Sequence, residues 1–188
     1  MDPTWQSLKG QFLVAMPGLV DPNFYQSVTC LAEHNPKGAM GIVISRVHPE
    51  VTARMIFDEL QIPVVAGVQN KPVHIGGPVH MNEIFVLHSG PFSWEGSLMV
   101  SAELALSNSR DILEAIAAGR GPQSFIVAMG CAGWGPGQLE SEIRANAWIT
   151  GPYSEAIVFE MEVDRRWEAA MALIGIDPAL LSDTAGHA

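Results

Sequence analysis

Basic side chains are scarce in this sequence: ten lysines and arginines stand against 20 aspartates and glutamates, which gives a formal net charge of −10. Nucleic-acid binding draws most of its affinity from lysine and arginine side chains that neutralise phosphates. The same negative charge repels an anionic membrane surface. The composition therefore argues against direct binding to nucleic acid or to membranes, although it leaves room for a small basic patch.

Cysteines are scarce as well. Cys30 and Cys131 are the only two, too few for a disulfide framework or for a zinc site with four cysteine ligands, so we expect two reduced thiols. Histidines are present, but His34, His74, His80 and His88 lack the i, i+4 spacing of a helical metal site. No metal ion and no cofactor are expected from these patterns.

Long apolar runs are absent. The longest, such as residues 125–129, are far shorter than the roughly 20 residues that span a bilayer, so no membrane-spanning segment is predicted. Residues 1–5 contain no basic region followed by an apolar segment, which predicts no secretory signal. The cytoplasm is therefore the expected location.

What the sequence does have is the composition of a globular chain, with 48% hydrophobic and 16% charged residues. A chain of 188 residues is long enough for one sizeable core, since domains commonly run to roughly 100–200 residues. We find no linker, internal repeat or low-complexity tract. The expectation is a single domain over residues 1–188.

Short apolar segments between turns with glycine or proline predict the strands, and capped periodic segments predict four helices. The loop 34–38 contains proline and glycine, so the strands on either side of it form an antiparallel hairpin. Strands and helices do not alternate strictly, which favours an α+β fold over a doubly wound parallel sheet. The predicted strands are 11–16, 27–32, 39–44, 73–75, 83–89, 97–101, 123–130 and 156–163, and the predicted helices are 52–60, 107–118, 137–144 and 164–174.

Motifs spread over nearly the whole chain resemble one family. They are FLVAMP at 12–17, DPNF at 21–24, EHN at 33–35, GAMG at 38–41, GGPV at 76–79, FVLH at 85–88, SRD at 109–111, AGW at 132–134, GQLE at 137–140, NAW at 146–148 and GHA at 186–188. In their order and spacing they resemble the YqgE/AlgH family of bacterial proteins. Two positions depart from the family pattern: Val47 changes the exit from a strand, and Cys131 stands where tyrosine is common.

The resemblance implies an α+β domain in which a bent or bifurcated, mixed and mainly antiparallel sheet forms a partial barrel flanked by helices. It implies little about function. Most members are uncharacterised, and some are labelled as transcriptional regulators linked to alginate production. The family offers no established catalytic residue to transfer, and a shared fold does not define an activity. Because relatives replace Cys131, essential chemistry at this thiol is not expected.

Two glycine-rich segments are positions where backbone can approach a ligand. The turn Gly76-Gly77-Pro78 is one, and the loop Gly133-Trp134-Gly135-Pro136-Gly137-Gln138, which opens a helix, is the other. Neither has the lysine of a phosphate-binding loop, and both are also typical of purely structural turns. With two histidines as possible acid–base groups, the candidate ligand-binding residues are His34, Gly76, Gly77, His88, Trp134, Gly135, Gly137 and Gln138.

Three functions remain open. The first is a regulatory or binding domain for a protein or a small ligand, without sequence-specific DNA contacts, because the basic doublet Arg165-Arg166 lies in the first turn of a helix and no helix-turn-helix pattern is present. The second is an enzyme with a cleft between the turn at 76–78 and the loop at 133–135, completed by His34 or His88. The third is an oligomer with tryptophans in its interface.

Overall fold

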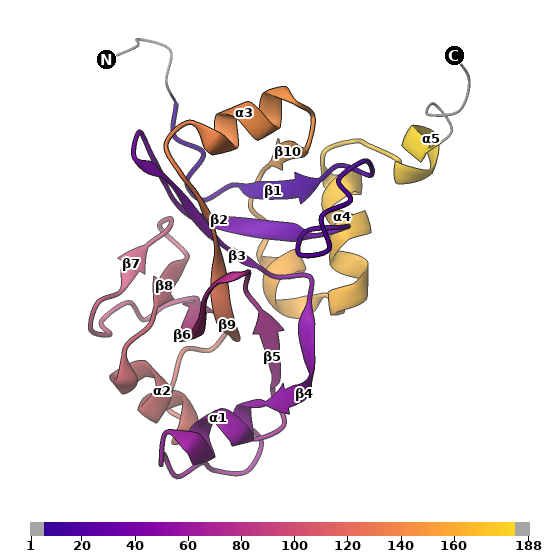
Figure 1. Ribbon diagram of the computed structural model, residues 1–188. Helices are drawn as coiled ribbons and strands as arrows, with labels where there is room; N and C mark the ends of the chain where they lie inside the picture. The colour runs from indigo at the N-terminus through magenta and orange to yellow at the C-terminus, as the bar shows by residue number, and fades with distance from the viewer. Residues whose placement is uncertain (1–5, 183–188) are drawn as a thin grey trace, which may run out of the picture.

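The computed structural model describes residues 6–182 (Figure 1). The N-terminal segment 1–5 and the GHA motif at 186–188 lie outside the described residues. Ten strands form one sheet, which is not closed into a barrel, in the order β10-β1-β2-β3-β9-β6-β8-β7, with β4 and β5 branching from β9. The strands are β1 Phe12–Ala15, β2 Val28–Asn35, β3 Gly38–Val43, β4 Val47–Thr52, β5 Pro72–Ile75, β6 Val79–His88, β7 Leu98–Met99, β8 Ala105–Ser107, β9 Phe125–Trp134 and β10 Trp148–Gly151.

The sheet divides along β9. The second half of β9 pairs with β3, through Ala39 opposite Trp134, whereas its first half pairs with β5 in the one parallel register of the described sheet, through Val73 opposite Val127. On its other side β9 pairs with β6. The α+β class and the bifurcated, mainly antiparallel sheet are therefore confirmed. The expected end of this strand at Gly130 is wrong, because the pairing with β3 and β6 carries it to Trp134.

Period-two alternation explains why both faces of the sheet are covered. In β1, Phe12 and Val14 face a core that contains Trp167 of helix α4 (Arg166–Leu173). Leu13 and Ala15 face the other side, with Leu139 of helix α3 (Gln138–Arg144). A third cluster packs helices α1 (Ala53–Glu59) and α2 (Arg110–Ala117) against β6. In Figure 1, α1 and α2 lie at the opposite end of the molecule from α3.

The helices fall where capping and periodicity place them, with one substantial error. The strand expected at 156–163 is wrong: residues Ala156–Glu160 form a π-helical turn, followed by a 3₁₀ turn, Val163–Arg165. Within this π-helical turn the adjacent residues Ile157 and Val158 are both buried, whereas a strand with one solvent-exposed face would alternate buried and exposed side chains. Strands β4, β8 and β10 were not expected. They are short, and in β4 no residue is buried. A short helix α5, Pro178–Ser182, follows α4.

No helix within the described part of the chain is long and apolar enough to cross a membrane. Both thiols, Cys30 and Cys131, are free and buried. Burial raises the pKa of Cys30 to about 12 and also raises that of Cys131, where the charge of Glu83 adds to the effect. Both are therefore protonated at neutral pH, the state of small apolar core residues.

Candidate functional site

Five of the eight candidate residues gather where β2, β9 and α3 meet. The strand pairing brings His34 opposite Ala39 and Ala39 opposite Trp134. The chain then turns through Gly135 and Gly137 into α3. Gly137 adopts a φ of 72°, a left-handed conformation at the position before the helix, which glycine adopts without a steric cost. The side chains that hold this junction together, namely His34, Trp134, Gln138, Glu140, Glu142 and Trp148, are called the α3 anchor below.

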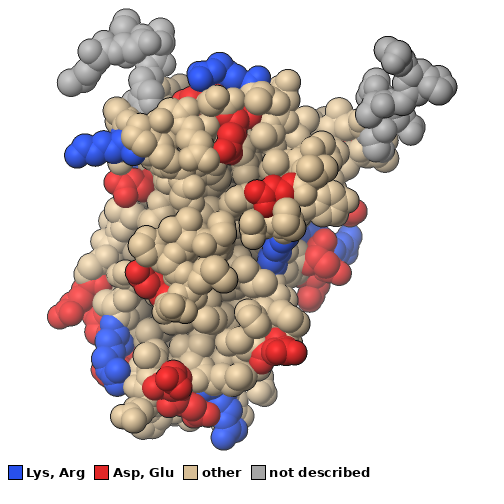
Figure 2. All heavy atoms as spheres, viewed as in Figure 1, with Lys and Arg blue, Asp and Glu red and all other residues tan. Residues whose placement is uncertain are grey.

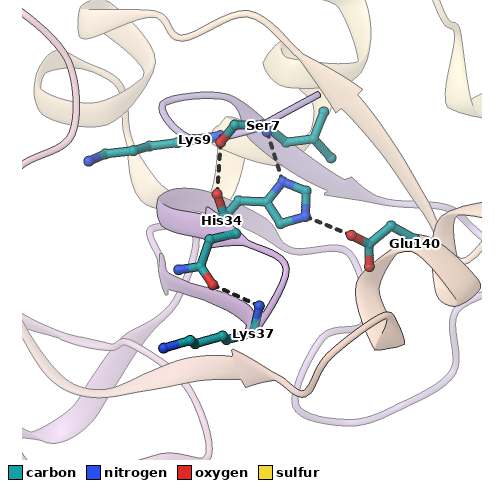
Figure 3. Close-up of polar contacts among 7 residues, drawn as sticks. Ser7, Lys9, His34, Lys37 and Glu140 are labelled. Atoms are coloured by element: carbon teal, nitrogen blue, oxygen red, sulfur yellow. Dashed lines mark hydrogen bonds and ion pairs between the residues drawn. The ribbon is translucent and has the colours of Figure 1, made fainter. Parts of the chain in front are cut away.

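His34 uses both ring nitrogens inside the protein (Figure 3). The backbone N–H of Leu8 donates to its Nδ1 at 2.8 Å. Because Nδ1 accepts there, the ring proton lies on Nε2, which donates to the Glu140 carboxylate at 3.0 Å. The hydroxyl of Ser7 donates to the carbonyl of His34 at 2.9 Å. With a side chain only 2% exposed, His34 ties the N-terminal segment, β2 and α3 together.

Glu142 is the second centre of the anchor. The indole N–H groups of Trp134 and Trp148 donate to its Oε2 at 2.9 and 2.8 Å, and the amide of Gln138 donates to its Oε1 at 2.9 Å. Gln138 in turn accepts from the N–H of Gly135 at 2.9 Å. Phe24 stacks on Trp134 at 6.1 Å and meets Trp148 edge-on at 5.3 Å. The glycine-rich loop at 133–138 therefore has a structural role, because it positions two tryptophans to donate to one carboxylate.

An open groove of about 320 Å³ lies beside this anchor, along the β2–β3 hairpin. Its polar groups are partly ordered: the amide of Asn35 donates to Glu33 at 3.0 Å, and its oxygen accepts from the N–H of Lys37 at 2.8 Å. Lys37 is exposed, and its ammonium takes part in none of the ion pairs formed by the described residues. The groove is lined by Glu33, Asn35, Lys37, Gly38, Ala39, Met40 and Trp134.

Gly76 and Gly77 do not line a cleft. Both are buried, and they pack directly on the backbone of β9. A Cβ on Gly76 would lie 2.1 Å from the carbonyl oxygen of Gly130, and one on Gly77 would lie 2.3 Å from the backbone of Cys131. The turn at 76–78 therefore packs against β9, the strand that leads into the loop at 133–135. Because the backbones of the turn and the strand are in van der Waals contact, no cleft opens at the turn itself.

His88 belongs to another region, because it lies at the end of β6 opposite Phe125, the far end of β9 from Trp134. Its Nδ1 donates to the carbonyl of Ser89 at 2.7 Å, so its Nε2 accepts, from the hydroxyl of Ser107 at 2.9 Å. Burial lowers the pKa of His88, against the opposing hydrogen bond to Ser89. Of the two histidines considered as alternatives for the cleft, His34 thus lies beside Trp134, and His88 lies at the other end of β9.

Metal binding finds no support in the geometry of residues 6–182, where no three histidine, cysteine, aspartate or glutamate side chains converge in a way that could hold an ion. The four histidines considered above lie in different surroundings. His34 and His88 are buried in the networks just described, His80 is exposed and pairs with Glu83 at 3.0 Å, and His74 is buried beside Arg166.

Comparison with known proteins decides the family. The model of the AlgH-like family matches residues 12–179. A UPF0301 protein of Desulforapulum autotrophicum is 50% identical over 181 residues, 96% of each chain. Another, from Thioalkalivibrio sulfidiphilus, is 49% identical over 178 residues, 95% of each chain. The chain belongs to the AlgH-like family. The resemblance noted in the sequence is thereby confirmed.

Solved structures of the AlgH-like fold agree with this assignment. The solution structure of AlgH from Pseudomonas aeruginosa has a TM-score of 0.80 and 43% identity, with 100% of this chain and 98% of that chain covered. A crystal structure of a protein from Corynebacterium diphtheriae has a TM-score of 0.71 at 22% identity, covering 89% of this chain and 87% of that one. The second likeness concerns the fold alone.

Sequence reasoning missed the two carboxylates at the centre of the anchor. Glu140 appeared in the sequence only as part of the GQLE motif, but it accepts from His34, 106 residues away in the sequence. Glu142 was not considered. The signal that could have found it is the pair of tryptophans at 134 and 148, because a buried indole N–H requires an acceptor and Glu142 lies between them in the sequence.

Arg166 was also misplaced. The sequence showed it only as part of a basic doublet in the first turn of a helix, where basic side chains are usually exposed, but it is only 4% exposed. Its guanidinium donates to the carbonyls of Met161 and Ile44 and to Nε2 of His74. The residue is therefore an internal tie between α4 and the sheet.

Proposed function

We propose that this AlgH-like chain is a cytoplasmic binding domain that acts through a partner, a protein segment or a small ligand, held in the groove beside the β2–β3 hairpin. The observation that carries this proposal is the position of Lys37. Its ammonium forms no ion pair with residues 6–182, and it borders a groove of about 320 Å³ that includes Trp134 of the α3 anchor. Pre-organised concave surfaces with a few exposed polar groups are the usual form of binding sites.

Binding is favoured over catalysis here because the groups with acid–base potential are already engaged. His34 accepts at one ring nitrogen and donates at the other. A general base must be free to take a proton from a substrate. Glu142 likewise receives three N–H donors. These residues therefore support a rigid binding surface.

A partner other than DNA is favoured by the distribution of charge. Figure 2 shows lysines and arginines scattered among aspartates and glutamates over the visible face, without a continuous basic stripe. Tight binding of a polyanion requires such a stripe, because lysine and arginine side chains must replace the counterions condensed on the phosphates. In a polarisation assay with labelled duplexes at low salt, we expect no saturable binding below micromolar concentration, whereas tight, salt-sensitive and sequence-selective binding would overturn this part of the proposal.

The groove is tested by placing a photo-crosslinking amino acid at position 33, an exposed residue of the groove lining, in living bacteria, with the same amino acid at the exposed position 59 as the matched control. This choice leaves Lys37 in place. Intact-mass spectrometry and gel migration then detect small-molecule and protein adducts alike. A discrete adduct at position 33 that is absent at position 59 supports the proposal. Equal labelling at both positions, or none at either, contradicts it.

A second candidate function, hydrolysis by a nucleophilic serine, is favoured by the contact between Ser107 and His88. A serine whose hydroxyl donates to a histidine, itself oriented through its other nitrogen, is the arrangement of an activated nucleophile. Ser107 also borders a cavity of about 270 Å³. We rank this function second because Ser107 is only 1% exposed.

A fluorophosphonate probe separates the two candidates. Hydrolysis predicts one covalent adduct that is lost in Ser107→Ala and kept in Ser97→Ala, which removes the neighbouring hydroxyl, 2.7 Å from that of Ser107. A chain that stays unlabelled at millimolar probe, or an adduct that survives Ser107→Ala, removes this candidate.

A further inference from the structure

Arg166 is a buried cation without a direct ion-pair partner. None of the ion pairs among the described residues involves it. Its Nε donates to the carbonyl of Met161 at 3.0 Å, and its Nη1 lies 2.6 Å from the carbonyl of Ile44 and 3.1 Å from Nε2 of His74. Burying a charge in this way is costly unless every donor finds an acceptor.

One donor of Arg166 remains available. Its Nη2 makes no hydrogen bond within residues 6–182, and it is not among the fully enclosed polar atoms that lack a partner. Arg166 also borders a cavity of about 110 Å³. We therefore assign Nη2 as the part of the guanidinium that reaches this cavity. A free guanidinium nitrogen is suited to a carboxylate, because a hydrogen bond between two charged groups is stronger than one between neutral groups.

The other walls of the cavity favour the same ligand. Lys71 supplies a second positive charge and keeps its ammonium 5.7 Å from the centre of the Phe125 ring, and no acidic side chain lines the cavity. The charge of Glu162 acts on Arg166, but Glu162 is not part of the lining. The remaining walls are mostly apolar: the cavity is lined by Lys71, Pro72, His74, Phe125, Ile126, Val127, Phe159, Val163 and Arg166.

The contact with Arg166 determines the tautomer of His74 in the wall of this cavity. The guanidinium can only donate, so Nε2 of His74 accepts and the ring proton lies on Nδ1. That Nδ1 is fully enclosed, and a hydrogen bond with the backbone of Val127 opposes the lowering of the His74 pKa, so His74 holds Arg166 in place and does not meet a ligand itself. The cavity is thus bordered by Lys71 and by the free donor of Arg166, inside a chain whose net charge is −10.

We propose that Lys71 and Arg166, the latter held in place by His74, form a binding site for a small organic monocarboxylate, with the carboxylate on Nη2 of Arg166 and near Lys71, and a short apolar tail against Phe125 and Phe159. These residues are called the Arg166 site. Inorganic phosphate fits it less well, because the apolar walls offer no replacement for its hydration. The site is separate from the β2–β3 groove, so it does not depend on the function proposed for that groove.

The test uses the full chain with butyrate as the probe, and with phosphate and chloride at equal ionic strength. Thermal unfolding should shift upward by about 3 °C at saturating butyrate, with at most a small shift in the other two salts. Amide signals of Lys71, Val73, His74 and residues 125–127 should move with the same saturation curve. Equal shifts in all three salts would indicate general screening and overturn the proposal, as would a response to phosphate alone or no response at all.

Two variants and a control locate the site. Lys71→Gln removes an exposed charge, so the chain should fold normally and bind butyrate about tenfold more weakly. Arg166→Lys keeps a charge but loses Nη2 together with the hydrogen bonds that hold the guanidinium in place, and it should abolish saturable binding. Lys9→Gln is the matched control and should bind as the parent does. If Arg166→Lys fails to fold, Lys71→Gln still decides: unchanged affinity in that variant refutes the site.

Discussion

In both the α3 anchor and the Arg166 site, a charged side chain has neutral hydrogen-bond partners instead of an oppositely charged one. The two regions differ in how completely these neutral partners satisfy the hydrogen-bonding capacity of the charged group. In the anchor, Glu142 receives two indole N–H groups and one amide N–H, and His34 uses both ring nitrogens. In the Arg166 site, Nη2 of the guanidinium has no hydrogen-bond partner among residues 6–182. The comparison separates a region built for rigidity from one with capacity left for a ligand.

The difference also predicts which perturbation each region resists. A matched network fails when a partner is removed, because the groups left behind are buried and unsatisfied. An incompletely matched cation responds to protonation of its neighbours and to anions, since little else balances its charge. Substitutions should therefore change the stability of the anchor most, whereas pH and added anions should have the larger effect at the Arg166 site.

The largest effect should come from Glu142→Ala, which leaves two indole N–H groups without an acceptor. Hydrogen bonds to a charged group each contribute about 1.5–3 kcal/mol, and partial exposure of Glu142 reduces their sum, so we expect a loss of about 4 kcal/mol in the free energy of unfolding. Urea unfolding followed by tryptophan fluorescence measures it. Glu59→Ala, on the exposed face of α1, serves as the control, and a loss below about 1 kcal/mol at Glu142 would show that the anchor is not matched as described.

The next effect depends on pH and belongs to His74. Burial, followed by the charge of Arg166, lowers the pKa of His74 to about 4, from an ordinary value of 6.5. The unfolded chain therefore binds the proton more readily, and stability is lost as pH falls from about 6.5 to 4. The shift corresponds to about 3 kcal/mol.

The contribution of His74 is isolated by comparison with His74→Leu, because His88 also has a lowered pKa and acts with the same sign. Between pH 7 and pH 4 the free energy of unfolding of the parent should fall by about 3 kcal/mol more than that of His74→Leu, since the variant has no such proton to bind. Parallel curves for the two chains would contradict the assignment of His74 as a buried neutral imidazole.

Local sequence signals recover most of the fold but little of either region. The hairpin of β2 and β3, the long strand β9 and the helices follow from periodicity and turn residues, which act over a few positions. The contacts of His34 with Glu140 and of Arg166 with Ile44 span 106 and 122 residues. No local sequence pattern encodes contacts between residues so far apart. These contacts nevertheless determine which hydrogen-bond partners each polar group has.

The glycine motifs illustrate the same limit. Gly76 and Gly77 were singled out as positions where backbone can approach a ligand, but the sequence alone does not say whether the approaching group is a ligand or another strand. The structure places the backbone of β9 there, at Gly130 and Cys131. The π-helical turn at Ala156–Glu160 was missed for the converse reason, since a short apolar run fits a strand or a helical turn equally well.

A smaller effect is expected for His34→Ala, again at the anchor. The variant leaves the N–H of Leu8 without its acceptor and removes the hydrogen bond to Glu140, which predicts a loss of about 2 kcal/mol. His34→Asn tests the assigned tautomer, because its amide oxygen can replace Nδ1 as acceptor for Leu8 and restore part of the loss. If His34→Asn is as unstable as His34→Ala, the hydrogen bond from Leu8 does not contribute as inferred. Chemical denaturation at pH 7 measures both variants.

The smallest effect on stability should come from Lys37→Ala, and that is what makes the variant useful. Lys37 is exposed and forms none of the ion pairs seen among residues 6–182, so its removal should change the free energy of unfolding by less than about 0.5 kcal/mol. The anchor beneath the groove would then remain intact while the groove loses its cation. A partner identified by crosslinking should bind the parent and lose affinity for this variant, with Lys9→Ala as the control of equal charge. Unchanged binding in a fully folded Lys37→Ala chain would separate the rigidity of the anchor from recognition in the groove, and would leave the anchor as a purely structural device.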